Sequence, residues 1–272
     1  MCGIIGIHAN RKVGTELYEG LVHLQHRGQD AAGILTSDGS FHLKKGKGFV
    51  REIFHDTNVK RIKGDWGIAH TRYSTTGSAA DLKNAQPFSF EGKYKVAIDH
   101  NGNLTNYYQL KKEMAEKGVK FETSSDVEVL CRIFEKGLEV HSEEPDFFEA
   151  VCKATEQVYE KAKGAYSVVG IIQGKGLFAF RDPHGIRPLV WGKREQKDWS
   201  TDYIFSSENT MYYHLGFVRQ GDVGAGEVFF VDQEGKLSRR KLRHELFTPD
   251  VFEYVYFARA AAIINDVSVY RA

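Results

Sequence analysis

The chain has 272 residues, and its 37 Lys and Arg against 36 Asp and Glu leave a formal net charge of +1. This length fits one large domain or two small ones, and the balanced charge disfavours nucleic acid or another polyanion as a partner. No stretch reaches the roughly 18 apolar residues of a membrane span, and no basic region precedes an apolar segment at the N-terminus. We therefore predict neither a membrane anchor nor a secretion signal.

The three cysteines are Cys2, Cys131 and Cys152. They form no CxxC pair and no cluster with histidine at zinc spacing, and an odd number fits poorly with a secreted disulfide framework. We expect a cytoplasmic protein without a metal site in this chain. Cys131 and Cys152 lie in predicted helices, where core packing is the favoured explanation for both.

Apolar periodicity in the first hundred residues predicts strands over 2–7, 30–37, 41–44, 66–70 and 94–98. A helix is predicted over 14–25, because Leu17, Leu21 and Leu24 share one of its faces. The segment 50–63 is charged and ambiguous, and no element is assigned to it.

Polar stretches follow two of these strands. The strand over 66–70 leads into a loop over 71–77 that is dense in hydrogen-bond donors, and the glycine and hydroxyl content of 72–77 predicts that it is mobile. A polar connection over 84–87 leads to the strand over 94–98, which is expected to end at the polar residues 99–103.

Three helices are predicted in the middle of the chain. The first runs from near Thr105 to before Gly118, and the third covers 146–161. The second opens where Ser125 and Glu128 have the spacing of a capping box.

The last third of the chain predicts strands over 165–173, 177–181, 188–192, 203–206, 227–231 and 237–242. Strands and helices thus occur in blocks rather than in regular alternation. This order favours an α+β fold, with antiparallel sheets and helices packed outside them, over a doubly wound parallel sheet.

Cys2 is the first candidate for chemistry. If Met1 is removed, Cys2 carries both a thiol and a free α-amine, which can serve as nucleophile and base. A free α-amine titrates at about 7.7–8.0, so a useful fraction is unprotonated at neutral pH. The alternative is that Cys2 is a small buried residue beside an ordinary start codon.

Asn101 and Gly102 offer a side-chain amide and a backbone N–H for an oxyanion. The alternative is an ordinary turn, since Asn-Gly is a common turn dipeptide. Arg72 has a planar fork that fits a carboxylate, and Asp126 can pair with an ammonium group. Taken singly, Arg72 could be a structural ion-pair residue and Asp126 a charge at a helix N-terminus.

The histidines nearest these motifs are His26, His70 and His100, and we expect each to be a hydrogen-bonding structural residue rather than a base.

The motifs occur in the order and approximate spacing found in class II glutamine amidotransferase domains, which the chain resembles from Cys2 to about Tyr270. The matching stretches are 2–6, 26–33, 70–73, 101–102 and 125–126. Within that family, the stretches 27–33, 182–189 and 252–259 resemble the amidophosphoribosyltransferases, which open purine synthesis. The resemblance implies an N-terminal-nucleophile hydrolase fold, a four-layer αββα sandwich with two stacked antiparallel sheets.

The resemblance also implies roles for individual residues. Cys2 would be the nucleophile that releases ammonia and glutamate from glutamine, and Asn101 with Gly102 would form the oxyanion hole. Arg72 and Asp126 would hold the carboxylate and ammonium groups of glutamine. Tyr73 and Arg27 are implied as supporting residues near the nucleophile.

By the same resemblance, 2–258 would be the glutaminase domain and 259–272 a remnant of the junction to a phosphoribosyltransferase domain absent from this chain. No pyrophosphate-binding loop is visible, and Ala260, Ala261 and Ala262 stand where the family usually has Pro-Asp. We expect an oligomer in which a separate phosphoribosyltransferase or other ammonia-acceptor subunit uses the ammonia. Magnesium is expected only with such a partner, and no iron–sulfur cluster is expected.

Two alternatives remain. The chain could be a non-catalytic glutamine-binding or regulatory subunit, which a retained Met1 would favour because the blocked amine could not act as the base. It could also hydrolyse another amide on the same scaffold, since fold alone does not determine the substrate. The pairing of Arg72 with Asp126 favours an α-amino acid.

Overall fold

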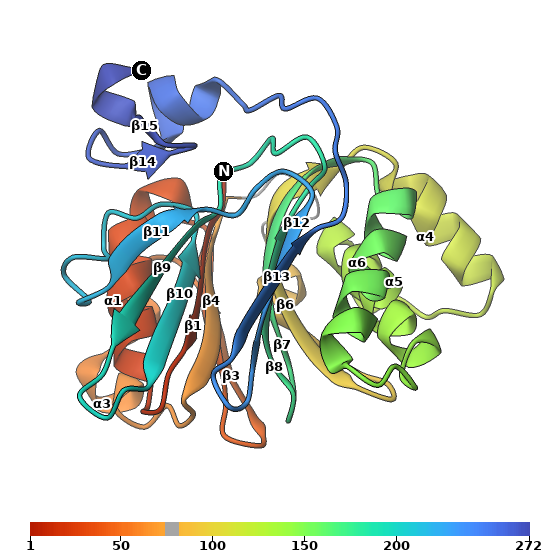
Figure 1. Cartoon of the computed structure of the whole chain (residues 1–272), viewed down its shortest axis with the longest axis horizontal. Coiled ribbons are helices and arrows are strands. Elements are labelled where there is room, and N and C mark those ends of the chain that lie inside the picture. The colour runs from red at the N-terminus through yellow and green to blue at the C-terminus, as the bar shows by residue number, and fades with distance from the viewer. Residues whose placement is uncertain (74–81) are drawn as a thin grey trace.

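The computed structural model describes residues 1–73 and 82–272, and within these ranges the long strands form two antiparallel sheets that face each other (Figure 1). In spatial order, the first sheet contains β11 (Val218–Asp222), β9 (Val190–Glu195), β10 (Thr201–Ser206), β1 (Gly3–His8), β4 (Trp66–Arg72), β2 (Ala31–Ser37) and β3 (Phe41–Lys47). The second sheet contains β13 (Leu237–Lys241), β12 (Glu227–Asp232), β8 (Gly176–Arg181), β7 (Gly164–Ile172), β6 (Lys95–Leu104) and β5 (Phe88–Glu91).

Helices cover the outer face of each sheet (Figure 1). The first sheet is covered by α1 (Gly14–Leu24), with the short α2 (Val50–Ile53) and α3 (Asp56–Val59) beside it. The second is covered by α5 (Asp126–Val140) and α6 (Phe147–Lys161), with α4 (Tyr107–Glu116) packed against α5. The predicted α+β fold, two stacked antiparallel sheets between helical layers, is confirmed.

A small C-terminal unit lies above the first sheet, at the end where the N-terminus is found (Figure 1). It contains a π-helical turn at Glu253–Phe257 and a pair of short strands, β14 (Ile263–Ile264) and β15 (Val267–Ser268). The backbone N–H of Ile263 donates to the side chain of Asn209 at 2.8 Å, which fastens this unit to the body.

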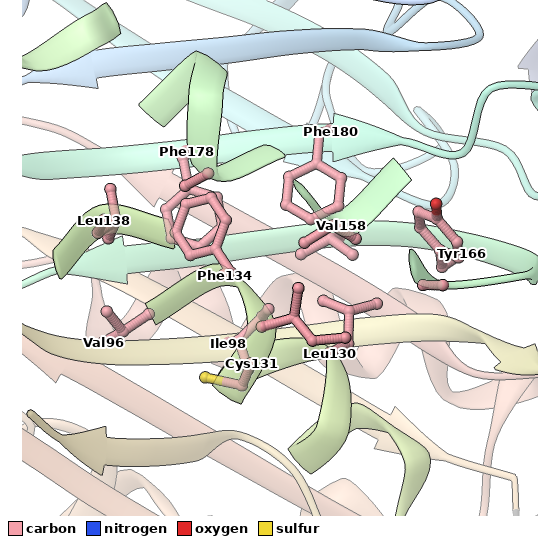
Figure 2. Close-up of a cluster of buried hydrophobic side chains, with 14 of the residues drawn as sticks. Val96, Ile98, Leu130, Cys131, Phe134, Leu138, Val158, Tyr166, Phe178 and Phe180 are labelled. Carbon is pink, nitrogen blue, oxygen red and sulfur yellow. The ribbon is translucent and has the colours of Figure 1, made fainter. Parts of the chain in front are cut away.

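Apolar side chains fill the space between the second sheet and its helices (Figure 2). Phe134 of α5 stacks on Phe178 of β8, with ring centroids 4.4 Å apart. Burying one such side chain stabilises a fold by about 1.5–3 kcal/mol. Cys131 and Cys152 are free thiols buried in this core, as predicted.

β1 lies in the middle of the first sheet and is buried along its whole length. It pairs with β4 on one edge, where Gly3 lies opposite Thr71, and with β10 on the other. The predicted strand is therefore confirmed, although it begins at Gly3 rather than Cys2. This placement brings the N-terminus to the space between the two sheets (Figure 1).

The prediction that a strand ends at 99–103 is wrong. β6 continues to Leu104 and pairs with β7, so that Asn101 lies opposite Ser167 and Gly102 opposite Tyr166. The turn interpretation of Asn101 and Gly102 fails with it. The polar side chains suggested the end of a strand. Pairing with β7 nevertheless keeps these residues in the strand, and the N–H groups of His100 and Leu104 donate to side chains at its other edge.

The capping box at Ser125 and Glu128 is also wrong, although α5 begins where it was predicted. The Ser125 side chain makes no capping bond. The Glu128 carboxylate instead reaches further back and accepts from the backbone N–H groups of Glu122 and Thr123, at 2.9 and 2.8 Å. It orders the segment before the helix rather than the first turn itself.

The remaining differences are short elements. No prediction was made for β5, β11, α2, α3 or the β14–β15 pair, which have too few residues for a periodic pattern. Thr71 and Arg72, predicted in a loop, continue β4, and residues 74–77 of that loop lie outside the described residues. Within residues 1–73 and 82–272, no helix combines the length and the apolar character that crossing a membrane requires.

Candidate active site

Cys2 lies directly before β1, where β1 and β4 of the first sheet come close to β6 of the second. Its backbone nitrogen donates to Oδ1 of Asn101 on β6, at 3.2 Å. Its thiol donates to the carbonyl oxygen of Tyr73, just after β4, at 3.6 Å. Residues that are about seventy and a hundred positions away in sequence are thus held against the second residue of the chain.

A small pocket opens beside the Cys2 thiol, and its lining combines residues from β4, β6 and the start of α5. The described residues that line it are Cys2, Arg72, Tyr73, Gln86, His100, Gly102, Ser125 and Asp126. Of the seven residues proposed from the sequence, the pocket contains all but Asn101 and Arg27, and both of these bond to Cys2 directly.

The pocket also contains Gln86, His100 and Ser125, which sequence reasoning missed as site residues. His100 directly precedes Asn101, Ser125 directly precedes Asp126, and Gln86 lies in the polar stretch 84–87. Proximity in sequence to the candidate residues is therefore the signal that could have identified them.

One edge of β6 presents hydrogen-bond donors to this pocket. The N–H groups of a strand point alternately to its two edges. Those of His100 and Leu104 point away from β7 and donate to Gln86 Oε1 at 2.7 Å and to Asp126 Oδ2 at 2.9 Å. By this alternation the N–H of Gly102, which lies between them, faces the same edge.

Asn101 adds a second donor beside this edge. Its Oδ1 is engaged by the nitrogen of Cys2, whereas its Nδ2 is buried and has no hydrogen-bond partner among the described residues. A buried N–H without a partner is unfavourable by roughly 1–3 kcal/mol. An oxygen atom bound in the pocket would satisfy it.

Gly102 is required here by packing rather than by access to its N–H. A Cβ at this position would lie 1.9 Å from the carbonyl oxygen of Ala165 in β7. The missing side chain therefore lets β7 pack closely against the strand that carries the two donors. This differs from the expectation that glycine serves mainly to expose its own backbone.

Arg72 and Asp126 bring opposite charges to the pocket from two sides. Arg72 is the last residue of β4 and Asp126 the first of α5, and both are almost completely buried. A buried guanidinium and a buried carboxylate on one pocket match the carboxylate and ammonium groups of an α-amino acid.

Arg27 lies behind Cys2, on the side away from the pocket. Its Nε donates to the carbonyl oxygen of Cys2 at 3.0 Å, and its two terminal nitrogens bond Glu208 at 2.7 Å and Glu253 at 2.8 Å. Burial alone would lower the pKa of Arg27, but the carboxylates of Glu253 and Glu208 raise it overall. The guanidinium is therefore a permanently charged support for the backbone of Cys2.

The thiol of Cys2 needs a base. Burial raises its pKa, although the bond to the Tyr73 carbonyl and the nearby positive charges act in the opposite direction. Burial lowers the pKa of His70 to about 3 and also lowers that of His100. Both imidazoles are neutral and poor bases, as expected, but His70 is not the hydrogen-bonding residue that was expected, because neither of its ring nitrogens has a partner among the described residues.

The chain's own α-amine is the better candidate base. Burial lowers the pKa of the amine present here, that of Met1, to about 6. The base expected from the sequence is instead the amine of Cys2 after removal of Met1, and the unprotonated form of such an amine can accept the thiol proton. Within the described residues no cluster of histidine, cysteine or carboxylate side chains could hold a metal ion.

Comparison with known proteins gives similarities that extend over the whole chain. A family model described as "Glutamine amidotransferase domain" matches residues 70–212. Amidophosphoribosyltransferase from Escherichia coli is 41% identical over 276 residues, which cover 100% of this chain and 54% of that protein.

Two solved structures are also similar. Glutamine phosphoribosylpyrophosphate amidotransferase from B. subtilis, complexed with ADP and GMP, has a TM-score of 0.83 and 30% identity over 98% of this chain and 55% of its own. A structure described as the allosteric regulatory enzyme of purine biosynthesis has a TM-score of 0.84 and 29% identity, over 98% and 55%. The chain thus spans about half the length of each of these relatives.

Proposed function

The chain belongs to the class II glutamine amidotransferase family, and we propose that it hydrolyses the side-chain amide of L-glutamine with Cys2 as the nucleophile. The observation that carries this proposal is the convergence of Cys2, Arg72 and Asp126 on one pocket. The two charges suit the backbone groups of a free amino acid and leave its side chain to reach the thiol. The single carboxamide of glutamine then becomes the reacting group.

Removal of Met1 would turn the peptide nitrogen of Cys2 into the α-amine that the chemistry requires. In the present geometry the N–H of this nitrogen donates to Asn101 Oδ1 at 3.2 Å, a contact that would hold a future amine in place beside the thiol. The amine takes the thiol proton while the sulfur forms a bond to the amide carbon of glutamine. The carbonyl oxygen becomes an oxyanion.

The donors for that oxyanion would be Asn101 Nδ2 and the N–H of Gly102. Collapse of the tetrahedral intermediate breaks the C–N bond, and the protonated α-amine returns its proton to the leaving nitrogen, so that ammonia departs. Water then attacks the remaining thioester, and glutamate and the free thiol are regenerated. Glutamine and water are consumed, and glutamate and ammonia are formed.

Ammonia released into water would be lost and largely protonated, so we propose that it passes to an acceptor site on a partner. The C-terminal unit carries exposed apolar side chains, among them Val251, Phe252, Val255 and Tyr256. Such a group of side chains is typical of a surface that docks another protein or domain. Residues 259–272 would then be part of the junction to that domain.

By analogy with amidophosphoribosyltransferase, we propose that the acceptor is a phosphoribosyltransferase that serves purine synthesis. Magnesium would be needed only by that acceptor. The acceptor is carried by a longer form of the chain or by a separate subunit.

The experiment that tests the glutaminase activity is intact-mass measurement before and after reaction with a diazo-ketone analogue of glutamine. We expect a chain without Met1 that gains one adduct, mapped to Cys2, together with glutamate formation from glutamine. A chain that keeps Met1, stays unlabelled and forms no glutamate would overturn the proposal and favour a glutamine-binding regulatory subunit.

A further inference from the structure

Gln86 occupies the place of a neighbouring strand beside β6. β5 pairs with β6 only as far as Phe88 and Ile98. Beyond that point the Gln86 carboxamide accepts from the N–H of His100 at 2.7 Å and donates to its carbonyl oxygen at 3.3 Å. One side chain thereby supplies both hydrogen bonds that a paired strand would have made at His100.

Asn84 makes a similar two-bond contact with Ser124. Its Oδ1 accepts from the backbone N–H of Ser124 at 3.1 Å, and its Nδ2 donates to the Ser124 hydroxyl at 3.1 Å. Ser124 lies two residues before Asp126, so this contact fixes the chain just before α5.

The segment 84–87, which carries both amides, is itself held from behind. Lys45 of β3 donates its ammonium group to the carbonyl oxygen of Ala85 at 2.6 Å. Gly33 of β2 leaves room for it, because a Cβ there would lie 2.2 Å from the carbonyl oxygen of Gln86. The segment is therefore anchored to the first sheet, while its two amides hold groups that surround the pocket.

We propose that Gln86 and Asn84 are positioning residues for glutamine hydrolysis, Gln86 for the oxyanion donors and Asn84 for the ammonium-binding carboxylate. This inference rests on the proposed function of the site. Neither residue reacts. Gln86 orients the backbone of β6 at His100, and thereby the N–H of Gly102 two residues later. Asn84 positions the backbone at Ser124, and thereby Asp126 at the start of α5.

The two roles predict different kinetic effects. The oxyanion exists only in the transition state, so a misdirected Gly102 N–H lowers kcat. Asp126 would bind the ammonium group in the ground state as well, so a displaced Asp126 raises KM. A 1 Å displacement of reacting groups can lower a rate by about 10²-fold.

The variant Gln86→Met keeps the length of the side chain and removes both hydrogen bonds to His100. We expect kcat for glutamine to fall about 10-fold to 100-fold, with KM changed less than about threefold. For Asn84→Leu we expect KM to rise about tenfold with a smaller change in kcat.

A matched control is available at Asn106. Its carboxamide also bonds backbone at both ends, donating to the Lys161 carbonyl at 2.8 Å and accepting from the Lys163 N–H at 3.0 Å, and it does not line the pocket. Asn106→Leu should lower the melting temperature about as much as Gln86→Met while leaving kcat and KM within about twofold of wild type.

Two electrophiles separate positioning from folding. Iodoacetamide alkylates Cys2 without using the oxyanion donors, whereas the diazo-ketone analogue must occupy the glutamine site. In Gln86→Met the diazo-ketone reaction should slow in parallel with kcat/KM, and iodoacetamide should react at the wild-type rate. Equal slowing of both would show general damage to the site and overturn the positioning role.

The variant Gln86→Glu gives a pH signature. An ionised carboxylate can accept from the His100 N–H but repels the His100 carbonyl, whereas a protonated carboxyl can make both bonds. Its kcat relative to wild type should therefore rise as the pH falls. A structural defect alone would give a constant ratio.

The outcomes distinguish this inference from the proposed function. Wild-type protein that hydrolyses glutamine, combined with a Gln86→Met variant of unchanged kcat and an Asn84→Leu variant of unchanged KM, would overturn the positioning roles alone. Wild-type protein without Met1 that neither hydrolyses glutamine nor reacts with the diazo-ketone would overturn the proposed function and the positioning roles with it.

Discussion

The two sides of Cys2 are built in opposite ways. Behind it, Arg27 is buried with its hydrogen bonds directed to the Cys2 carbonyl, Glu208 and Glu253. In front, buried polar atoms such as Asn101 Nδ2 and His100 Nε2 have no partner among the described residues. Behind Cys2, the hydrogen bonds of Arg27 give its backbone a rigid support. In front, the polar atoms without a partner can bond the oxygen and nitrogen atoms of a ligand.

This contrast separates residues that hold the site from residues that act on substrate. Changes behind Cys2 should lower stability first, and changes in front should lower turnover first. The predictions below test that division, beginning with the residue that both sides share.

Replacing the nucleophile should have the largest effect. Cys2→Ala removes the thiol and its contact with the Tyr73 carbonyl but keeps the backbone contacts of Cys2 with Asn101 and Arg27, so we expect kcat to fall by more than about 10⁴-fold with little change in melting temperature. Glutamate formation with pure enzyme measures this. Appreciable residual hydrolysis that tracks the purified protein would assign the chemistry to another group.

Removing the support behind Cys2 should mainly destabilise the fold. Arg27→Met removes the cation that bonds both buried carboxylates and leaves only His26 beside Glu208 at 2.8 Å and Arg187 beside Glu253 at 3.8 Å. We expect the free energy of unfolding to fall by about 3 kcal/mol. Urea denaturation measures it. Arg27→Lys should recover part of the loss, and a loss below about 1 kcal/mol for Arg27→Met would contradict the assignment.

Changing the front should mainly affect turnover. Asn101→Asp keeps an oxygen that can accept from the Cys2 nitrogen but replaces the unpartnered donor with a second acceptor. We expect kcat to fall by about 10²–10³-fold, the usual result of losing one oxyanion donor. Thermal unfolding should change little. A tenfold or smaller loss of kcat would place the oxyanion elsewhere.

The smallest effect concerns pH. Burial lowers the pKa of His70 from the ordinary 6.5 to about 3. Between pH 6.5 and about pH 3, His70 is therefore protonated in the unfolded chain and neutral in the folded chain. Stability contributed by neutral His70 is present above pH 6.5 and is lost as the pH falls from about 6.5 towards about 3.

Urea denaturation at about pH 6 and about pH 5 tests this. The drop in unfolding free energy should be about 1.2 kcal/mol smaller for His70→Gln than for wild type. The exposed His55 provides a control, since His55→Gln should leave the wild-type drop unchanged. Equal drops for His70→Gln and wild type would contradict a neutral buried His70.

Much of the fold could be predicted because its long elements carry periodic patterns. The leucines of α1 and the apolar runs of β1 and β7 indicate type and extent directly. The end of β6 was predicted too early because its last residues are polar and several of them contact the pocket. The apolar pattern that indicates a strand therefore ends before the strand itself. Short elements such as α2 and β11 contain too few residues to show a period.

Most residues at the front of the site could be predicted, whereas at the back only Arg27 could be. Cys2, Arg72 and Asp126 belong to recognisable stretches and carry chemistry that can be argued residue by residue. The partners of Arg27 lie 181 and 226 residues away in sequence, and nothing local in those glutamates indicates that they meet an arginine. Only the three-dimensional arrangement reveals that pairing.

The central position of β1 also has a consequence for how the protein is made. Its two neighbours end at Arg72 and Ser206, so one edge of β1 has no partner until most of the chain has been synthesised. Chains leave the ribosome N-terminus first, and domains fold as units. The Cys2 carbonyl can meet the completed Arg27 support only after Glu253 has been synthesised, so this support cannot be complete until nearly the whole chain exists.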